Sequence, residues 1–472
     1  MTTYYVDGTN GSDANNGSSS APFQTIGATV SRVQPGDTVV VMPGAYFEEV
    51  TLVTDGTADA YITFKAFTPA KEIVKAHGVN HAVPPGGVLL HGREYGFNVR
   101  ACYQRIEGFF VTADTRGSGI PIVVKSSDVP GKPFHHVEIC DNVCFSGPQA
   151  GIATLAADYV FIRGNIAYQS ASVSDWEGSG ISICAHTNPS DCDAEAWHFI
   201  IEDNICYNNS NYSAGRRKKF NDPTTGFKGP GCTDGNGIIV DYGYNEPTGR
   251  TLVRNNILYN NGGRGIVITA SGNVATINNT LYDNAWDPHF WGGYCEYAEV
   301  ETGNDGSTFG RPGTIGRFKN IFVNNIVCSK ANGETVHGSA DALNARYLDY
   351  NCHFNGKTAA PGAHDVCDAD PILTNPPPPV DDSRFIDRAG DYPLDVHHYF
   401  DVDFSLKDGS PCIGVGYTVG SDFAKPDEMT EEMAAELRYF LDKGLPEYDI
   451  YGNKRDPKKM DLGAVAYSTV SK

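Results

Sequence analysis

A short pattern recurs through the chain and constrains its fold more than any other feature. An asparagine is followed by an aliphatic residue and then by polar and aromatic residues, as in DNVCFSG, GNIAYQS, DNICYNN, NNILYNN, NNTLYDN and NNIVCSK. The two short intervals predict a structural unit of about two dozen residues, and the longer ones predict units with inserted loops. The aliphatic positions, at intervals of 23, 39, 52, 24 and 45 residues, are Val143, Ile166, Ile205, Ile257, Leu281 and Ile326.

A second pattern, Gly-Ile followed by alternating residues, lies between copies of the first. It appears as GIATL from Gly151, GISIC from Gly180, GIIVD from Gly237 and GIVIT from Gly265. Period-two alternation predicts strands with one buried face. Because such short strands cannot each bury that face alone, stacked turns must share a continuous core. The sequence therefore predicts an all-β fold, a parallel β-solenoid. A β-sandwich or a propeller is the competing architecture, but propeller blades repeat at about 40 to 50 residues.

The recurring asparagines are expected to form a ladder inside the turns of the solenoid. Stacked side-chain amides can hydrogen-bond along the axis, and asparagine tolerates the left-handed conformation of tight turns. Ordinary turn residues are the alternative interpretation. The predicted column contains Asn142, Asn165, Asn204, Asn256 and Asn325.

The two ends of the chain differ from its middle, and we expect one domain over residues 1–472. Residues 1–50 predict an N-terminal helical cap with a first turn, and 51–350 predict solenoid turns with long inserted loops. Residues 351–472 predict the last turns, loops and one helix. That helix is expected in 427–444, because it begins with acidic residues and has Lys443 and then Gly444 at its end.

Composition narrows the class of partner. The formal charge of −21 disfavours nucleic acid, and it weighs against a polyanionic sugar unless a cation bridges the two. The sequence contains no stretch of eighteen apolar residues, so it predicts no membrane-spanning helix. Among twelve cysteines, the close spacings of Cys184 with Cys192 and of Cys352 with Cys367 suggest disulfides in a secreted protein. Buried free thiols are the alternative. The start, MTTYYVDGTNGSD, has no signal-peptide pattern, so secretion implies a removed leader and an intracellular location stays open.

Both ends of the chain resemble a known group of proteins. The stretch YYVDGTNGSDANNGSSSAPFQTIGATVSRVQPGDTVVVMPGAYFEEV resembles the opening of secreted right-handed parallel β-helix proteins, including family-nine pectate lyases and several β-helix glycoside hydrolases. The tail, FSLKDGSPCIGVG followed by DIYGNKRDPKKMDLGAVAY, resembles their C-terminal segment. The resemblance implies a right-handed parallel β-helix. It does not imply one reaction, because function depends on the site.

The resemblance weakens at the reactive positions. Where family-nine lyases have a lysine base in a DGNGFK-like turn, DGNGII places Ile239. Asp241 matches an aspartate of some β-helix glycosidases, but Thr269 stands where their partner glutamate is expected.

The central stretch TDGNGIIVDYGYN nevertheless contains the best candidates. Alternation places Ile238 and Val240 in the core and points Asp241 outward, beside Cys184, Thr269 and Leu155 of neighbouring turns. An exposed turn aspartate is the alternative for Asp241, and Asp234 could be a turn or cap residue. Long insertions surround this turn, and grafted loops usually carry function. Together these segments suggest catalytic residues Asp241, Asp234, Glu177, Arg264 and Lys219, and substrate-binding residues Trp176, His186, Arg216, Lys218, Tyr242, Tyr244, His289 and Trp291.

Three functions are compatible with these residues. A polysaccharide lyase acting by β-elimination on a uronic acid needs a cation or Arg/Lys at the carboxylate and a base near the C5 proton. Asp234 and Asp241 could hold Ca²⁺ for that purpose. A glycoside hydrolase needs two carboxyl groups, with Asp241 paired to Glu177 or Asp234. A tailspike-like or adhesive β-helix would bind glycans without cleaving them. We rank the lyase first and expect a monomer with a polysaccharide or oligosaccharide substrate.

Overall fold

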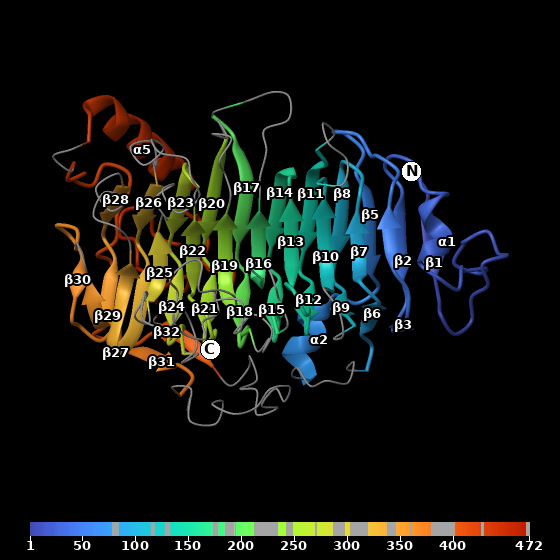
Figure 1. Ribbon diagram of the computed structural model, residues 1–472, viewed down its shortest axis with the longest axis horizontal. Helices are drawn as coiled ribbons and strands as arrows, with labels where there is room; N and C mark the ends of the chain where they lie inside the picture. The colour runs from blue at the N-terminus through green and yellow to red at the C-terminus, as the bar shows by residue number, and fades with distance from the viewer. Residues whose placement is uncertain are drawn as a thin grey trace, which may run out of the picture.

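The chain folds into a right-handed parallel β-helix whose coils stack along one long axis (Figure 1). The computed structural model describes residues 1–77, 85–114, 119–127, 133–172, 178–184, 193, 195–211, 235–241, 249–269, 271–286, 298–302, 320–337, 346–358, 361–378, 402–425 and 429–468. Within these residues three helices are assigned: α1 (Gly27–Val30), α2 (Ala70–His77) and α5 (Glu431–Gly444). No described helix is long and apolar enough to cross a membrane.

Most coils contribute one strand to each of three parallel ladders. Ladder 1 contains β1 (Thr3–Val6), β2 (Thr38–Val41), β5 (Ile62–Ala66), β8 (Gln104–Glu107), β11 (His135–Cys140), β14 (Asp158–Arg163), β17 (Trp197–Glu202), β20 (Arg250–Arg254), β23 (Val274–Ile277), β26 (Asn320–Val323) and β28 (Arg346–Asp349). Ladder 2 contains β3 (Gly44–Tyr46), β6 (Val88–Gly92), β9 (Phe110–Ala113), β12 (Val143–Phe145), β15 (Ile166–Tyr168), β18 (Ile205–Tyr207), β21 (Ile257–Tyr259), β24 (Thr280–Tyr282), β27 (Ile326–His337), β29 (Cys352–Thr358) and β30 (Val366–Cys367).

Ladder 3 runs along the middle of the view in Figure 1. It contains β4 (Val50–Leu52), β7 (Tyr95–Val99), β10 (Ile120–Lys125), β13 (Ile152–Leu155), β16 (Ser179–Cys184), β19 (Asn236–Asp241), β22 (Ile266–Thr269) and β25 (Ala298–Thr302). The long strand β27 passes from ladder 2 into ladder 3, because its later residues pair with β25. An antiparallel pair, β31 (Leu373–Asn375) with β32 (Asp403–Leu406), lies outside the ladders.

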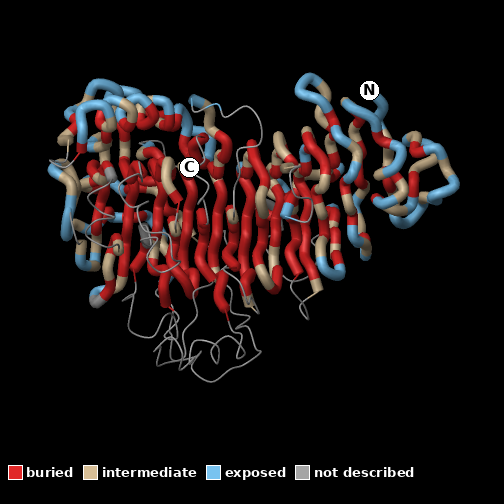
Figure 2. The backbone as a smooth tube through the Cα atoms, turned by 45° about the horizontal axis from the view of Figure 1, so that its top comes forward, coloured by how far each residue is buried: buried red, intermediate tan, exposed pale blue. Residues whose placement is uncertain are grey.

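One apolar core fills the coils from end to end, as the buried strands in Figure 2 show. At the N-terminal end, the segment around α1 contributes Phe23, Ile26 and Val33 to this core. The expected N-terminal cap is therefore confirmed. The helix expected near the C-terminus is also confirmed: Thr430 caps it by accepting a hydrogen bond from the Met433 amide, and Lys443 lies in its last turn. The sequence interpretation missed α2.

The predicted asparagine ladder is present and is longer than expected. Each ladder amide and side-chain Nδ2 donates to the Oδ1 of the asparagine in the next coil, with backbone N···Oδ1 distances of 2.9 to 3.0 Å. The left-handed residue of each turn is the one before the ladder position, for example Asn255 with φ 54° before Asn256. The members, including two that the sequence analysis omitted, are Asn142, Asn165, Asn204, Asn256, Asn279, Asn325 and Asn351.

A second ladder follows ladder 2 and runs in the same direction. The Ser170 amide donates to Asn209, which donates to Asn261, which in turn donates to Asn284. Because every amide donates toward the C-terminal end, each column ends with donors that need an acceptor. A carboxyl group supplies it in both cases: Asp365 accepts from the Asn351 amide at 2.6 Å, and Glu299 accepts from Asn284 at 2.8 and 2.7 Å.

One register prediction is wrong. Ile257 pairs with Thr280, and Thr280 with Ile326, so Leu281 is not the equivalent position. Leu281 instead pairs with Leu258 and lies in the core. In NNTLYDN the outward position is a threonine, Thr280, whereas the other copies have an aliphatic residue there. Matching aliphatic residues between copies therefore selected Leu281, one residue too late.

The predicted disulfide between Cys352 and Cys367 is also wrong. No disulfide joins Cys352 and Cys367 in the described part of the chain, and Cys192, the predicted partner of Cys184, lies outside that part. In the strand register Cys352 faces Val366, and Cys367 faces His353. The Cys352 thiol instead hydrogen-bonds Cys412, and that bond together with burial raises the pKa of Cys352.

The Gly-Ile motif has a steric cause. A β-carbon added at Gly237 would lie 2.7 Å from the Gly265 carbonyl oxygen, and one at Gly180 would lie 2.8 Å from that of Gly237. We expect Gly237→Ala to lower the free energy of unfolding by about 2 kcal/mol or more, because backbone of the next coil must move. Denaturant unfolding measures the effect. Gly27→Ala is the control, since the added carbon meets only the end of Glu48; equal stability of both variants would contradict the prediction.

The stability of the fold should depend on pH because the buried carboxyl group of Glu299 has a raised pKa. Burial raises the pKa of Glu299 from 4.5 to about 8, while the hydrogen bond from Asn284 acts in the opposite direction. Asp283 raises this pKa and Lys330 lowers it. An acid whose pKa is higher in the fold than in the unfolded chain stabilises the fold while protonated. This contribution is complete below about pH 4.5 and is lost as the pH rises through about 8.

We therefore expect the free energy of unfolding to fall by a few kcal/mol, at the order-of-magnitude level, between about pH 5 and about pH 9. Glu299→Gln removes the titrating group and should flatten that part of the profile. Urea unfolding of both proteins across this range measures the difference. An unchanged slope in the variant would show that Glu299 does not titrate in this way.

Candidate functional site

In the C-terminal half of the coils, two of the three outer faces are covered by C-terminal segments. The outer face of ladder 1 packs against α5 through Leu437, Phe440 and Leu441. The outer face of ladder 2 packs against Phe404 and Leu406 of β32 and against later C-terminal residues. A stack of aromatic rings on ladder 2, Tyr168 on Tyr207 on Tyr259, ends on Phe404. In these later coils the two faces are therefore occupied by the chain itself, whereas Arg105 and Arg163 on earlier strands of ladder 1 are exposed.

The long insertions flank ladder 3. Residues 173–177, 212–234 and 287–297 join the end of a ladder 2 strand to the start of a ladder 3 strand. Residues 185–192, 242–248 and 303–319 follow the ends of ladder 3 strands. Both corners of this ladder are thus lengthened at β16, β19 and β25, while β22, between the last two, has a short connection on each side.

Asp241 ends β19 in the middle of this group. Ile238 and Val240 of the same strand lie in the core, as alternation predicts. Asp241 pairs with Cys184 on one side and with Thr269 on the other, and Leu155 pairs with Cys184 one coil further on. This register is the one expected from the sequence. The Asp241 side chain is 0% exposed, so it is a buried carboxylate and not a surface turn residue.

Arg264 lies at the opposite end of the ladder 3 strands from Asp241. It lies two residues before β22, its backbone amide donates to Asn236 Oδ1 at 2.8 Å, and it is 3% exposed. Asn236 begins β19, five residues before Asp241, so the two positions are separated by roughly 16 Å along the strand direction. The fold therefore does not bring Asp241 and Arg264 together at one reacting atom.

A cation on the same face was missed in the sequence analysis. Lys125 ends β10 and pairs with Leu155, so Lys125, Leu155, Cys184 and Asp241 form one outward column. Three coil spacings place Lys125 roughly 14 Å from Asp241. Its ammonium group lies 5.9 Å from the centre of the Tyr95 ring. In GIPIVVK the Gly-Ile pair lies two residues before the position of Gly151-Ile152, but aligning its alternation with GIATL would have identified Lys125.

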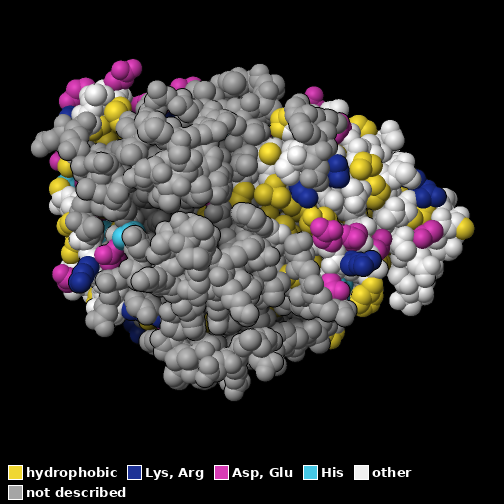
Figure 3. All heavy atoms as spheres, in the orientation of Figure 1, with side chains coloured by type: hydrophobic (Ala, Val, Ile, Leu, Met, Phe, Trp, Pro, Cys, Tyr) yellow, Lys and Arg dark blue, Asp and Glu magenta, His cyan; other side chains and the backbone are white. Residues whose placement is uncertain are grey.

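The outer face between these residues is apolar. Ile120, Val123, Ala150 and Ala153 form a small cluster with Tyr95 and Leu155 packed against it. On the face seen in Figure 3, hydrophobic side chains lie beside Lys/Arg and Asp/Glu side chains toward the N-terminal half of the coils. Trp286, an aromatic residue of the third insertion, is buried and donates its ring N–H to the Asn260 carbonyl at 2.7 Å, which is a structural role.

The remaining sequence-predicted site residues lie outside the described residues. Those inserted before ladder 3 strands are Trp176, Glu177, Arg216, Lys218, Lys219, Asp234, His289 and Trp291, and those inserted after them are His186, Tyr242 and Tyr244. For calcium, the described residues offer only Asp241 of the predicted pair and contain no group of three acidic, histidine or cysteine side chains that could hold a metal. Calcium takes six to eight oxygen ligands, so calcium binding stays a prediction.

Comparisons with known proteins give similarity in architecture at low sequence identity. Residues 9–51 match a family described as "Protein of unknown function (DUF1565)". Among solved structures, pectate lyase Pel9A is 18% identical, with coverage of 99% of this chain and 97% of that chain and a TM-score of 0.49. The GH136 lacto-N-biosidase from Eubacterium ramulus is 14% identical, covering 78% and 68%, with a TM-score of 0.45.

The alginate lyase from Paenibacillus sp. str. FPU-7 is 14% identical, covering 78% of this chain and 98% of that chain, with a TM-score of 0.42. No curated protein matches the sequence significantly.

Proposed function

We propose that the protein is a carbohydrate-active enzyme that cleaves a polysaccharide along the outer face of ladder 3 by β-elimination at a uronic acid. The observation that carries this proposal is the position of the insertions. At the coil that holds Asp241, ladders 1 and 2 are covered by the C-terminal part of the chain, whereas both corners of ladder 3 are lengthened. Loops grafted beside a rigid sheet are the usual location of binding and catalytic residues.

The chemistry of β-elimination fits the residue types on this face. Charge that develops on the uronate in the transition state must be stabilised by a cation. Lys125 supplies positive charge from β10, and Lys218 and Lys219 are candidates for it in an inserted segment. A base must then lie within hydrogen-bond reach of the C5 proton. Lys218, Lys219 and Arg264 are the sequence-predicted candidates for that base, and the carboxyl group of Asp241 is a further candidate.

A glycoside hydrolase is the second candidate, favoured by the buried carboxyl group of Asp241 beside the apolar residues Ile239 and Val267. Hydrolysis needs a second carboxyl group, about 5 Å away for retention or about 6.5–9.5 Å away for inversion. Glu177 and Asp234 are the candidates for that partner. Binding without cleavage is the third possibility.

One assay separates the three functions. The full chain is incubated with pectic, alginate and neutral glycans, in calcium and then in chelator. New ultraviolet absorbance from a conjugated uronate supports the lyase and, if chelator removes it, the calcium requirement. Reducing ends without that absorbance would assign the hydrolase. Binding with neither product would leave a glycan-binding protein and refute the proposed enzyme.

Removing the charge of Lys125 should weaken the binding of an anionic substrate. Lys125→Ala should raise KM for a uronic-acid glycan by about 5-fold, with a smaller change in kcat, because the ammonium contributes roughly 1 kcal/mol to binding at a partly exposed position. Lys65→Ala on ladder 1 is the control. An equal rise in KM on a neutral glycan would show that Lys125 does not recognise charge.

A further inference from the structure

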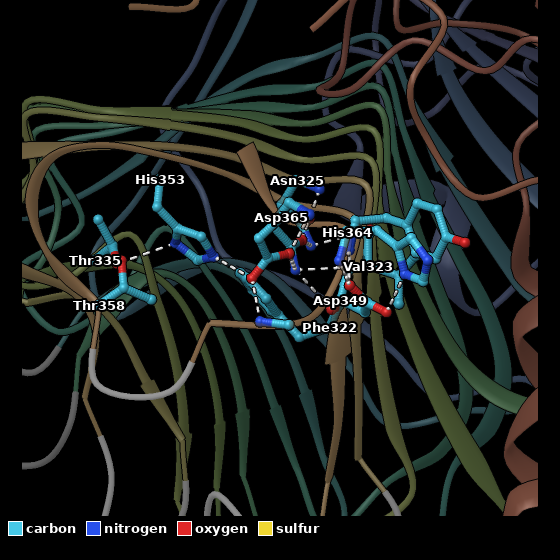
Figure 4. A network of polar contacts seen from close by, with 12 residues as sticks. Phe322, Val323, Asn325, Thr335, Asp349, His353, Thr358, His364 and Asp365 are labelled. Atoms are coloured by element: carbon cyan, nitrogen blue, oxygen red, sulfur yellow. Dashed lines mark hydrogen bonds and ion pairs between the residues drawn. The ribbon is translucent and has the colours of Figure 1, made fainter. Parts of the chain in front are cut away.

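The last coils contain a buried polar network that the proposed function does not use (Figure 4). Asp365, which ends the first asparagine ladder, also accepts a hydrogen bond from the Gly362 amide at 2.7 Å. His353 Nε2 lies 3.1 Å from Asp365 Oδ2, and His353 Nδ1 lies 3.0 Å from the Thr335 hydroxyl. The Thr335 hydroxyl lies 2.9 Å from that of Thr358. His353, Asp365 and Thr335 are buried at the C-terminal end of the core.

The donors and acceptors of this network can be assigned one after another. Asp365 accepts backbone N–H groups on both oxygens, as an ionised carboxylate does, so His353 Nε2 carries the proton that joins them. In the neutral ring Nδ1 then accepts, and Thr335 donates to it. The oxygen of Thr335 accepts in turn from Thr358. The Lys357 carbonyl, at 3.3 Å, is the more distant acceptor for Thr335.

The network opens into a cavity. Thr358 lines a cavity of about 570 Å³ together with Asn355, Lys357, Cys367 and Asp368. With its proton committed to Thr335, the Thr358 oxygen can only accept from a molecule in the cavity. Asp368 also accepts when ionised, Lys357 only donates, and the Asn355 amide does both. A volume of this size lies in the ordinary range of small-molecule sites.

We propose that this cavity binds a neutral polyhydroxylated ligand of about one sugar ring. Each hydroxyl of such a ligand both donates and accepts, so one molecule can satisfy the acceptor oxygens of Thr358 and Asp368 and the donor Lys357. An anion would meet the Asp368 carboxylate, and a cation would meet the Lys357 ammonium. The cavity lies on the last strands of ladders 2 and 3, β27, β29 and β30, several coils from Asp241, so it is a second site that does not depend on cleavage.

The exposed thiol of Cys367 gives a local readout. The full chain is titrated with methyl β-D-glucopyranoside, methyl β-D-galactopyranoside and methyl α-D-mannopyranoside. Saturation-transfer NMR measures binding, and peptide mass spectrometry measures the rate of Cys367 alkylation by iodoacetamide. We expect at least one glycoside to bind saturably and to slow alkylation several-fold. Thr358→Val should weaken that binding by about 5- to 10-fold, as expected for one lost hydrogen bond.

Asp368→Asn should also weaken binding. Because Asp368 lines the cavity without bonding to Thr335, this variant tests the site independently of the Thr358–Thr335 hydrogen bond. Thr63→Val on ladder 1 is the matched control and should change neither readout. Thermal unfolding of each variant confirms that it is folded. The proposal would be overturned if none of the three glycosides protects Cys367. It would also be overturned if Thr358→Val and Asp368→Asn bind the glycoside as tightly as the unmodified protein does. Because neither readout involves cleavage, these outcomes are independent of the glycan assay above.

Discussion

Asp241→Asn should abolish most of the cleavage activity. The substitution keeps the size of the side chain but removes the charge and the proton-transfer capacity of a buried group in the middle of ladder 3. General acid–base catalysis contributes about 10²- to 10⁴-fold to a rate, so we expect kcat/KM on the best glycan from the assay to fall by that factor. Initial rates of product formation measure the effect.

Two neighbours in the same outward column provide controls. Cys184→Ser and Thr269→Ser alter the coils on either side of Asp241 and should change kcat/KM by only a few-fold. Thermal unfolding distinguishes a chemical effect from loss of the fold. Full activity of a folded Asp241→Asn variant would remove Asp241 from the catalytic site, and the insertions would then have to supply the chemistry alone.

Asn256→Ala should be among the most destabilising single substitutions in the coils. Asn256 Oδ1 accepts from the Asn204 amide and Nδ2 at 3.0 and 3.1 Å, and its own Nδ2 donates to the Ile201 carbonyl and to Asn279, both at 2.9 Å. All of these groups are buried, and the alanine would leave several of them unsatisfied. We expect a loss of about 3–5 kcal/mol.

The midpoint of urea unfolding and the protection of backbone amides from hydrogen exchange measure this loss. Asn10→Ala is the control, because Asn10 bonds only to Asp7 on an exposed turn. A destabilisation no larger than that of the control would mean that water replaces the ladder contacts.

The repeat and its register could be predicted from the sequence because packing in a solenoid is nearly one-dimensional. A position such as Val240 contacts the same column in the coils before and after it, so local alternation determines its burial. Thr280 shows the limit of that approach. Its hydroxyl accepts a hydrogen bond from the Ala464 amide of the returning C-terminal segment, a contact that no local pattern encodes.

Residues whose role depends on distant chain were the ones that sequence analysis missed. Cys352 contacts Cys412, sixty residues later in the chain. Asp365 accepts the hydrogen bond from Asn351, the last asparagine of the ladder, and no local pattern marks it for that position. Lys125 precedes the Gly-Ile repeats and enters the Asp241 column only through strand register. Most of the predicted site residues belong to the insertions, outside the described part of the chain, so their arrangement stays a prediction.

The coil from Asn142 to Gly164 has 23 residues and no long insertion, and its two boundaries are equivalent ladder turns. Duplicating it in tandem would therefore add one coil to the β-helix without changing Asp365 or Glu299, the residues that end the two asparagine ladders. Lys125 would move about 4.8 Å further from Asp241, one strand spacing. The separation between Lys125 and the proposed catalytic residue Asp241 would then change in steps of one strand spacing. Comparing the shortest oligosaccharide that each variant cleaves would measure the length of the proposed binding face.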